Sequence, residues 1–167
     1  MRIFPLYDVF PMTELDEKLL NHFLNPRNIG DIDKPDGYGR AVNPVNEYFT
    51  DIYLRVKNGI IDDVKFKTFG CVVTIAAASA LTEIVKGKSV DEIIDTKDTV
   101  HNLLRSIHNE LGAVPEKNWH CPPVAVQALL NALVDYYQKM NDQQHVLRLE
   151  KLLEEVHCFF KDGQKAK

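Results

Sequence analysis

The chain has 167 residues, of which 45% are hydrophobic and 26% charged, as is typical of a single soluble globular domain. Its formal net charge is −4, from 20 Lys and Arg against 24 Asp and Glu, so it lacks the basic surplus of nucleic-acid-binding proteins. No apolar run reaches the roughly 18 residues of a membrane span, and the N-terminal residues do not form a signal peptide, so we expect neither nucleic acid nor a membrane as a partner.

The first expected helix begins near Thr13, after an N-terminal extension over residues 1–12. Its leucines and phenylalanine recur at helical spacing, and Asn25-Pro26 ends it because proline disfavours the helical conformation in the preceding residue. Residues 26–47 are rich in Pro, Gly, Asn and Asp and are expected to form a loop with one short strand near 38–43.

Two strands are expected next, because apolar and polar residues alternate over residues 49–56 and 60–69. Asn58-Gly59 between them is a hairpin signal, since both residues tolerate the positive φ of a tight turn. A period of two with one polar face indicates an antiparallel sheet that is covered on one side.

The remaining chain is expected to be helical, because apolar residues recur there at helical spacing. The predicted helices cover about 72–85, a short segment opened by the capping box Ser89–Glu92, about 98–111, from Pro122-Pro123 to about 140, and about 142–160. The division is therefore a domain over 13–140, a C-terminal helical extension over 141–161 and a disordered tail over 162–167. The last helix has one apolar stripe, which we expect to dock on the domain or on a second subunit.

The three cysteines are Cys71, Cys121 and Cys158, an odd and sparse count that favours reduced thiols in a cytoplasm. Cys71 stands where a strand gives way to a helix, and Cys121 directly precedes the Pro-Pro that opens another. Helix N-termini favour a thiolate, and the adjacent His120 adds an imidazole, so these residues could form a soft-ligand site for zinc or iron–sulfur chemistry. The alternative is that such a cysteine is simply a small buried hydrophobe.

Several motifs, taken together, resemble the NifU/IscU-type iron–sulfur cluster scaffold family. They occur in the family's order and at nearly its spacing, over about residues 14 to 140. They are His22-Phe23-Leu24-Asn25-Pro26-Arg27-Asn28-Ile29-Gly30, Val64-Lys65-Phe66-Lys67-Thr68-Phe69-Gly70-Cys71, Thr82-Glu83-Ile84-Val85-Lys86-Gly87-Lys88-Ser89 and His120-Cys121.

The resemblance implies an α+β fold, in which about five helices pack on a small three-stranded antiparallel sheet; the C-terminal amphipathic helix is an addition. It also implies a scaffold or carrier rather than an enzyme. Such a protein holds a [2Fe–2S] or [4Fe–4S] cluster, or iron, takes sulfur from a cysteine desulfurase, and passes the cluster to apo iron–sulfur proteins. Two family cysteines and the family histidine correspond to Cys71, Cys121 and His120.

The chain departs from the family pattern at the first cluster cysteine and the nearby aspartate. Asn46 stands in place of the cysteine, Glu47 in place of a glycine and Tyr48 in place of the aspartate. Asparagine and tyrosine are poor ligands for iron–sulfur clusters, whereas Glu47 could give a carboxylate to zinc or iron and is an additional candidate ligand. The chaperone-recognition segment before His120 retains only a proline, Pro115, so recognition by a dedicated chaperone is not expected.

Three functions follow as alternatives. The first is a divergent scaffold or carrier that uses Cys71, Cys121 and His120. The others are a cluster-free interaction or regulatory module, and a zinc protein with the same three residues and a carboxylate or water. Cys158 falls opposite the apolar stripe of its helix and is expected to face solvent. Since one chain supplies only two thiolates to the site, two chains could share a cluster in a homo-oligomer.

Overall fold

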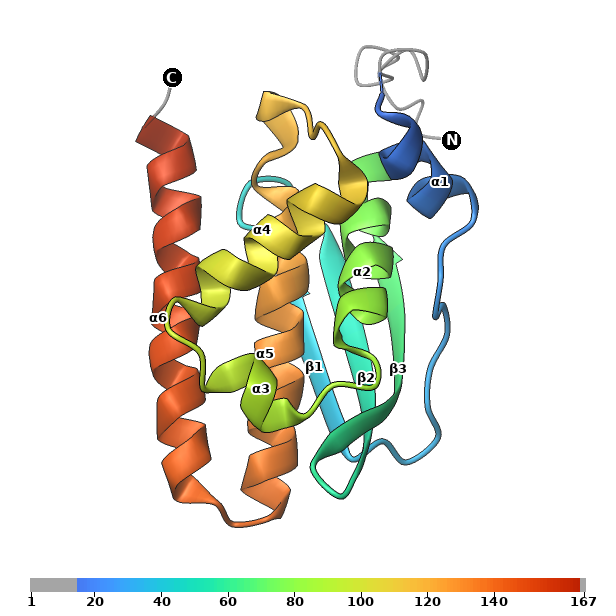
Figure 1. Cartoon of the computed structure of the whole chain (residues 1–167). Helices are drawn as coiled ribbons and strands as arrows, with labels where there is room; N and C mark the ends of the chain where they lie inside the picture. Colours follow the sequence, from blue (N-terminus) through green and yellow to red (C-terminus); the bar gives the residue numbers. More distant parts are fainter. Residues whose placement is uncertain (1–14, 166–167) are drawn as a thin grey trace.

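The computed structural model describes residues 15–165, so the expected N-terminal extension and the expected helix start at Thr13 lie outside the described residues. It confirms the α+β class, with a three-stranded sheet and helices packed against it (Figure 1). In chain order the elements are α1 (Glu17–Leu24), β1 (Gly37–Val42), β2 (Phe49–Lys57), β3 (Ile60–Phe69), α2 (Val72–Val85), α3 (Val90–Ile94), α4 (Thr99–Leu111), the 3₁₀ turn η3 (Glu116–Asn118), α5 (Cys121–Lys139) and α6 (Gln143–Lys165).

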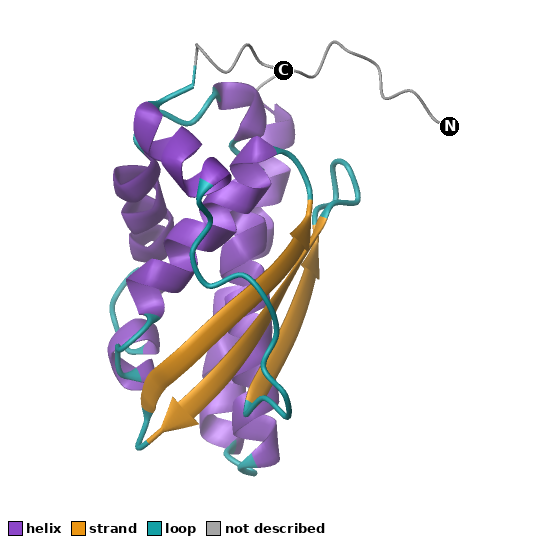
Figure 2. Ribbon diagram, turned by 90° about the vertical axis from the view of Figure 1, so that its right-hand side faces the viewer, coloured by secondary structure: helices purple, strands orange, loops and turns teal. Residues whose placement is uncertain are grey.

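The three strands form one antiparallel sheet in the order β1-β2-β3. The helices gather on one side of it (Figure 2), as the alternating pattern of the strands predicted. Asn58 and Gly59 form the predicted turn between β2 and β3, with φ angles of 51° and 74°. At the opposite end of the sheet the register brings Val42, Phe49 and Phe69 into one row across the three strands.

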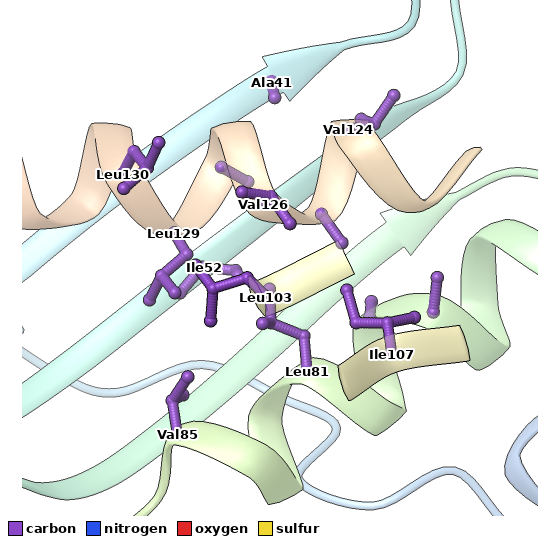
Figure 3. Close-up of a cluster of buried hydrophobic side chains, with 14 of the residues drawn as sticks. Ala41, Ile52, Leu81, Val85, Leu103, Ile107, Val124, Val126, Leu129 and Leu130 are labelled. Carbon is purple, nitrogen blue, oxygen red and sulfur yellow. The ribbon is translucent and has the colours of Figure 1, made fainter. Parts of the chain in front are cut away.

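The hydrophobic core lies between the helix-facing side of the sheet and helices α2, α4 and α5 (Figure 3). The strands supply large apolar side chains to it, and α2 supplies a run of small ones that lets it pack closely. The fully buried members include Ile52, Leu54, Val64, Phe66, Ala76, Ala77, Ala80, Leu81, Ile107, Val126, Leu129 and Leu130.

Strand β1 lies unusually close to α5 because two of its residues have no side chain. A Cβ atom on Gly37 would lie 2.3 Å from the carbonyl oxygen of Ala132, and one on Gly39 would lie 2.2 Å from the backbone nitrogen of Ala132. Only glycine permits this backbone-to-backbone approach. The position of α5, and of the Cys121 at its start, therefore depends on these two positions of β1.

The first and last helices differ from their expected limits. Helix α1 begins at Glu17, because Asp16 is its N-cap and its side chain accepts a hydrogen bond from the backbone N–H of Lys18 at 2.9 Å. Helix α6 continues to Lys165, past the expected end of the helical extension at 161. It packs along α5 through its apolar stripe, whose buried members are Val146, Leu149, Leu152, Val156 and Phe160.

Candidate functional site

Two of the three cysteines meet at one end of the molecule, where α2 and α5 both begin (Figure 1). Cys71 is the N-cap of α2 and directly follows the Gly70 that leaves β3, whereas Cys121 is the first residue of α5. Their sulfur atoms are 3.7 Å apart, although the residues are 50 positions apart in the chain. The resemblance to the family and the placement of both cysteines at helix starts together predicted this meeting.

The separation of the two sulfurs suits one metal ion. Two thiolates at about 2.3 Å from one tetrahedral ion have their sulfurs about 3.8 Å apart. The observed 3.7 Å agrees with that value, and both cysteines are free rather than in a disulfide. Cys71 is half-buried and Cys121 buried, so a bound ion would be reached from the Cys71 side.

The pKa values of the two thiols are shifted in opposite directions. The hydrogen bond from the Cys121 thiol lowers the pKa of Cys71 to about 5, with help from Thr74, whose Oγ1 lies 3.4 Å from the Cys71 sulfur. The same contact with Cys71, together with burial, raises the pKa of Cys121. The pair therefore carries one thiolate at neutral pH, on the more accessible sulfur at the start of α2, where the helix dipole also favours a negative charge.

An asparagine from the 3₁₀ turn borders the thiol pair. Asn118 Nδ2 donates toward the Cys71 sulfur at 3.7 Å, which favours the thiolate form. Its Oδ1 is buried and, within residues 15–165, has no hydrogen-bond partner. Buried polar atoms are nearly always paired, so an unpaired oxygen beside two thiols fits a place that gains a partner when a ligand arrives.

His120 lies beside the thiol pair, but the nearest partner of its ring is Asn43. Nδ1 of His120 is 3.7 Å from the Cys121 sulfur and only 2.7 Å from Nδ2 of Asn43, in the loop between β1 and β2. Burial lowers the pKa of His120, while the negative charge of Cys71 and a hydrogen bond with the Lys117 backbone oppose that shift. His120 is thus a neutral imidazole near neutral pH, as a metal ligand must be.

Glu47 was the remaining candidate ligand, whereas Asn46 and Cys158 were not expected to be ligands. Glu47 is exposed, and none of the hydrogen bonds or ion pairs among the described residues links its carboxylate to the thiols. Asn46 Oδ1 accepts a hydrogen bond from the backbone N–H of Tyr48 at 3.1 Å, so its amide closes a turn. Cys158 is exposed on α6, as the helical geometry predicted. Over residues 15–165 no group of three or more His, Cys, Asp and Glu side chains stands ready to hold a metal ion.

Sequence reasoning missed two neighbours of the thiols, Thr74 and Asn118, and one neighbour of His120, Asn43. Thr74 had a weak signal, because it lies one helical turn after Cys71. The other two had none, since Asn43 lies 77 positions from the histidine that it contacts and Asn118 lies 47 positions from Cys71. His22 has a structural role: it is buried on α1, and its Nδ1 is 2.8 Å from the hydroxyl oxygen of Ser79 on α2.

Comparison with known proteins assigns the chain to a family. The model of the NifU-like N-terminal domain matches residues 14–143. The chain belongs to this family. It is 41% identical over 143 residues to the iron–sulfur cluster assembly scaffold protein IscU 1 of Archaeoglobus fulgidus, covering 84% of this chain and 89% of that protein. It is 35% identical over 144 residues to the IscU scaffold protein of Aquifex aeolicus, covering 85% and 88%.

A solved structure shares the NifU-like fold at low sequence identity. It is a protein of Fervidobacterium islandicum assigned to the SUF system as an iron–sulfur cluster assembly scaffold. The TM-score is 0.55 at 14% identity, and the match covers 74% of this chain and 99% of that one. None of the helices within residues 15–165 is long and apolar enough to cross a membrane.

Proposed function

We propose that this chain is a scaffold on which an iron–sulfur cluster is assembled and from which the cluster passes to apo-proteins. The observation that carries the proposal is the pair of free thiols, Cys71 and Cys121, with sulfurs 3.7 Å apart at the start of two helices. Its setting in a NifU-like domain, and relatives that are named as IscU scaffold proteins, support the same function.

The two thiols have different parts in this function. Cys71, with a pKa lowered to about 5, supplies a thiolate that can bind iron at neutral pH without first losing a proton. Cys121 keeps its proton until a metal ion arrives, since metal binding displaces protons from thiols. Iron binding therefore begins at the more accessible sulfur and is completed at the buried one. His120 is the third candidate ligand.

We infer further that two chains share one cluster. Clusters are commonly held by four thiolates, and each chain offers two. The surroundings suit contact with a second copy: Val42, Val45, Phe69 and Trp119 are each more than half exposed. Val45 belongs to the loop that contacts His120, and Val42 ends the strand that leads into this loop. Phe69 ends β3 two residues before Cys71, and Trp119 directly precedes His120. A two-fold axis through the thiols would bury these apolar side chains against their own copies.

Electrostatics favour the same arrangement. Arg40 lies two residues before the row that ends the sheet, directly opposite Asp51, and its guanidinium donates to both carboxylate oxygens of Asp51, at 2.6 and 2.8 Å. This pairing neutralises the charge beside Phe49, over whose ring the guanidinium lies at 4.3 Å. Two copies can therefore meet at this end without bringing unpaired like charges together at this row.

The partners that this function requires are a cysteine desulfurase, as the source of sulfur, and apo iron–sulfur proteins as recipients. Reduced thiols are needed at both steps, so we place the protein in a reducing cytoplasm. The cluster is cargo here, because a scaffold gives it away rather than keeping it.

A second function, zinc binding by a single chain, is favoured by one observation. The 3.7 Å separation of the sulfurs equally suits Zn²⁺, and two thiolates with one imidazole make a common zinc ligand set that leaves the fourth position open. Zinc and cluster binding differ in content, because only the cluster contains sulfide.

The scaffold function is tested by reconstitution without oxygen. Purified protein is treated with ferric iron and sulfide, freed of unbound ions, and analysed for iron, acid-labile sulfide and zinc. We expect iron and sulfide in the parent protein and in Cys158→Ser, and neither in Cys71→Ser. Equal iron and sulfide in Cys71→Ser would remove the thiol pair from the function, and stoichiometric zinc without sulfide would favour the second function.

Sharing between chains is tested on the same material by size-exclusion chromatography with light scattering. We expect the visible absorption of the cluster to elute with the mass of two chains. Cluster absorption that elutes with a single chain, and that persists there in Cys158→Ser, would contradict the shared arrangement and leave the scaffold function itself in place.

A further inference from the structure

Asn43, at the start of the loop between β1 and β2, is fixed by hydrogen bonds of both its backbone and its side chain. It is fully buried, its backbone N–H donates to the carbonyl of Tyr48 at 2.6 Å, and its carbonyl accepts from the N–H of Glu47 at 2.9 Å. Its side-chain Oδ1 accepts from the backbone N–H of Val45 at 2.9 Å. One residue thus closes the whole loop over 43–48.

These bonds fix which way the amide of Asn43 points. The backbone N–H of Val45 can only donate, so the group that faces it must be the oxygen of the amide. A flipped amide would set two donors against each other in a buried place, which is strongly unfavourable. The NH₂ group therefore faces His120, whose Nδ1 is 2.7 Å away.

The orientation of the amide determines the tautomer of His120. An amide NH₂ is a donor only, so Nδ1 of His120 must accept and carries no proton. In the neutral ring the proton is then on Nε2. The capped nitrogen is the one that lies 3.7 Å from the sulfur of Cys121. Its single lone pair is used by Asn43 and is not available to a metal ion.

We propose that Asn43 is a positioning residue that holds His120 in the Nε2–H tautomer and keeps Nδ1 capped beside the thiols until cargo is captured. The consequence for metal binding rests on the proposed function; the tautomer does not. His120 can use Nδ1 as a ligand only after the bond to Asn43 breaks. Because Asn43 also closes the loop over 43–48, release of the ring is coupled to movement of that loop.

This coupling sets the order in which the thiols and the imidazole bind a metal ion. The sulfurs of Cys71 and Cys121 are adjacent and can bind a metal ion first, whereas Nδ1 of His120 is occupied by its hydrogen bond to Asn43. The loop that carries Asn46 and Tyr48, where the chain departs from the family pattern, becomes the element that controls His120.

The tautomer is tested by long-range ¹⁵N–¹H NMR of the reduced, metal-free protein at a pH where His120 is neutral. Asn43→Asp keeps an oxygen for Val45 but replaces the NH₂ with an acceptor. Asn46→Asp is the matched control, because Asn46 Oδ1 makes the same kind of bond, to the N–H of Tyr48 at 3.1 Å, in the same loop. We expect Nε2–H in the parent and in Asn46→Asp, and Nδ1–H in Asn43→Asp.

The capping is tested separately with zinc, by competition with a chromophoric chelator. Asn43→Ala no longer has to break the amide bond, so we expect it to bind zinc about 2- to 12-fold more tightly than Asn46→Ala, the factor equivalent to one net neutral hydrogen bond. Nδ1–H in the parent protein, an unchanged tautomer in Asn43→Asp, or zinc binding in Asn43→Ala no tighter than in Asn46→Ala would overturn the proposal. A parent protein that takes up no iron and sulfide would overturn the proposed function instead, and the tautomer prediction would stand.

Discussion

Replacement of Gly39 by alanine should destabilise the fold through a direct clash between strand and helix. An alanine Cβ there would lie 2.2 Å from the backbone nitrogen of Ala132 and 2.4 Å from the carbonyl oxygen of Ala128, where ordinary contact begins near 3.4 Å. Both obstructing atoms belong to the backbone of α5 and cannot rotate away. Strand and helix must therefore separate by about 1 Å.

The magnitude follows from two opposed effects. Gly39 does not have a positive φ, so alanine suits its backbone, and by itself the lost flexibility of the unfolded chain would raise stability by about 0.4–1 kcal/mol. Overpacking of a tight core costs roughly 1–3 kcal/mol and more where backbone must move. We expect a net loss of about 1–3 kcal/mol in the free energy of unfolding. Since Cys121 begins α5, we also expect weaker zinc binding by the thiol pair.

Urea unfolding followed by circular dichroism measures the loss, and Gly59→Ala is the control. Gly59 has a φ of 74° and nothing within 4 Å of an added Cβ, so alanine there costs about 1–2 kcal/mol by backbone conformation alone. It lies in the turn at the other end of the sheet and should leave zinc binding unchanged. A Gly39→Ala protein as stable as the parent would refute the close approach of β1 and α5.

Three further predictions follow. Iodoacetamide should still alkylate Cys71 of the metal-free protein at about pH 6, where an ordinary thiol is protonated, and the alkylation rate should fall as the pH drops through about 5. Mass spectrometry of the labelled peptide measures the rate, and a midpoint near pH 8.5 would contradict the prediction. Leu149→Ala on α6 should cost about 2–5 kcal/mol in urea unfolding, against about 0.5 for the half-exposed Leu147→Ala, and equal losses would mean that α6 does not dock on α5. Asn46→Cys with Tyr48→Asp should hold more iron and sulfide per chain on reconstitution than the parent, and an equal content would mean that the ligand deficit does not limit loading.

Local signals in the sequence predicted most of the secondary structure. Asn58-Gly59 gave the hairpin, and both residues have the expected positive φ. The capping box of Ser89 and Glu92 opens α3, and the prolines after Cys121 lie in the first turn of α5. Each of these signals acts within a few residues, so pattern reasoning can find it. Helix α1 begins at Glu17 with Asp16 as its N-cap, whereas the expected start at Thr13 lies outside the described residues.

Contacts between distant segments could not be predicted in this way. Nothing in the local pattern of Gly37 and Gly39 shows that a helix a hundred residues later lies against them. The thiol pair was predicted because both cysteines lie at helix starts and match cysteines of the family, whereas the hydrogen bond between Asn43 and His120 joins two residues that are 77 positions apart. The resemblance to a family located the cysteines and the histidine, but it did not indicate that the histidine would be capped.

Cluster transfer tests the scaffold function most directly. Protein loaded without oxygen and freed of unbound ions is mixed with an apo-protein that accepts a [2Fe–2S] cluster, the two are separated, and iron and acid-labile sulfide are counted on each. We expect both to move together to the recipient from the parent protein, and Cys71→Ser to carry nothing to transfer. Iron and sulfide that stay on this chain, or a chain that loads zinc and no sulfide, would contradict the scaffold function.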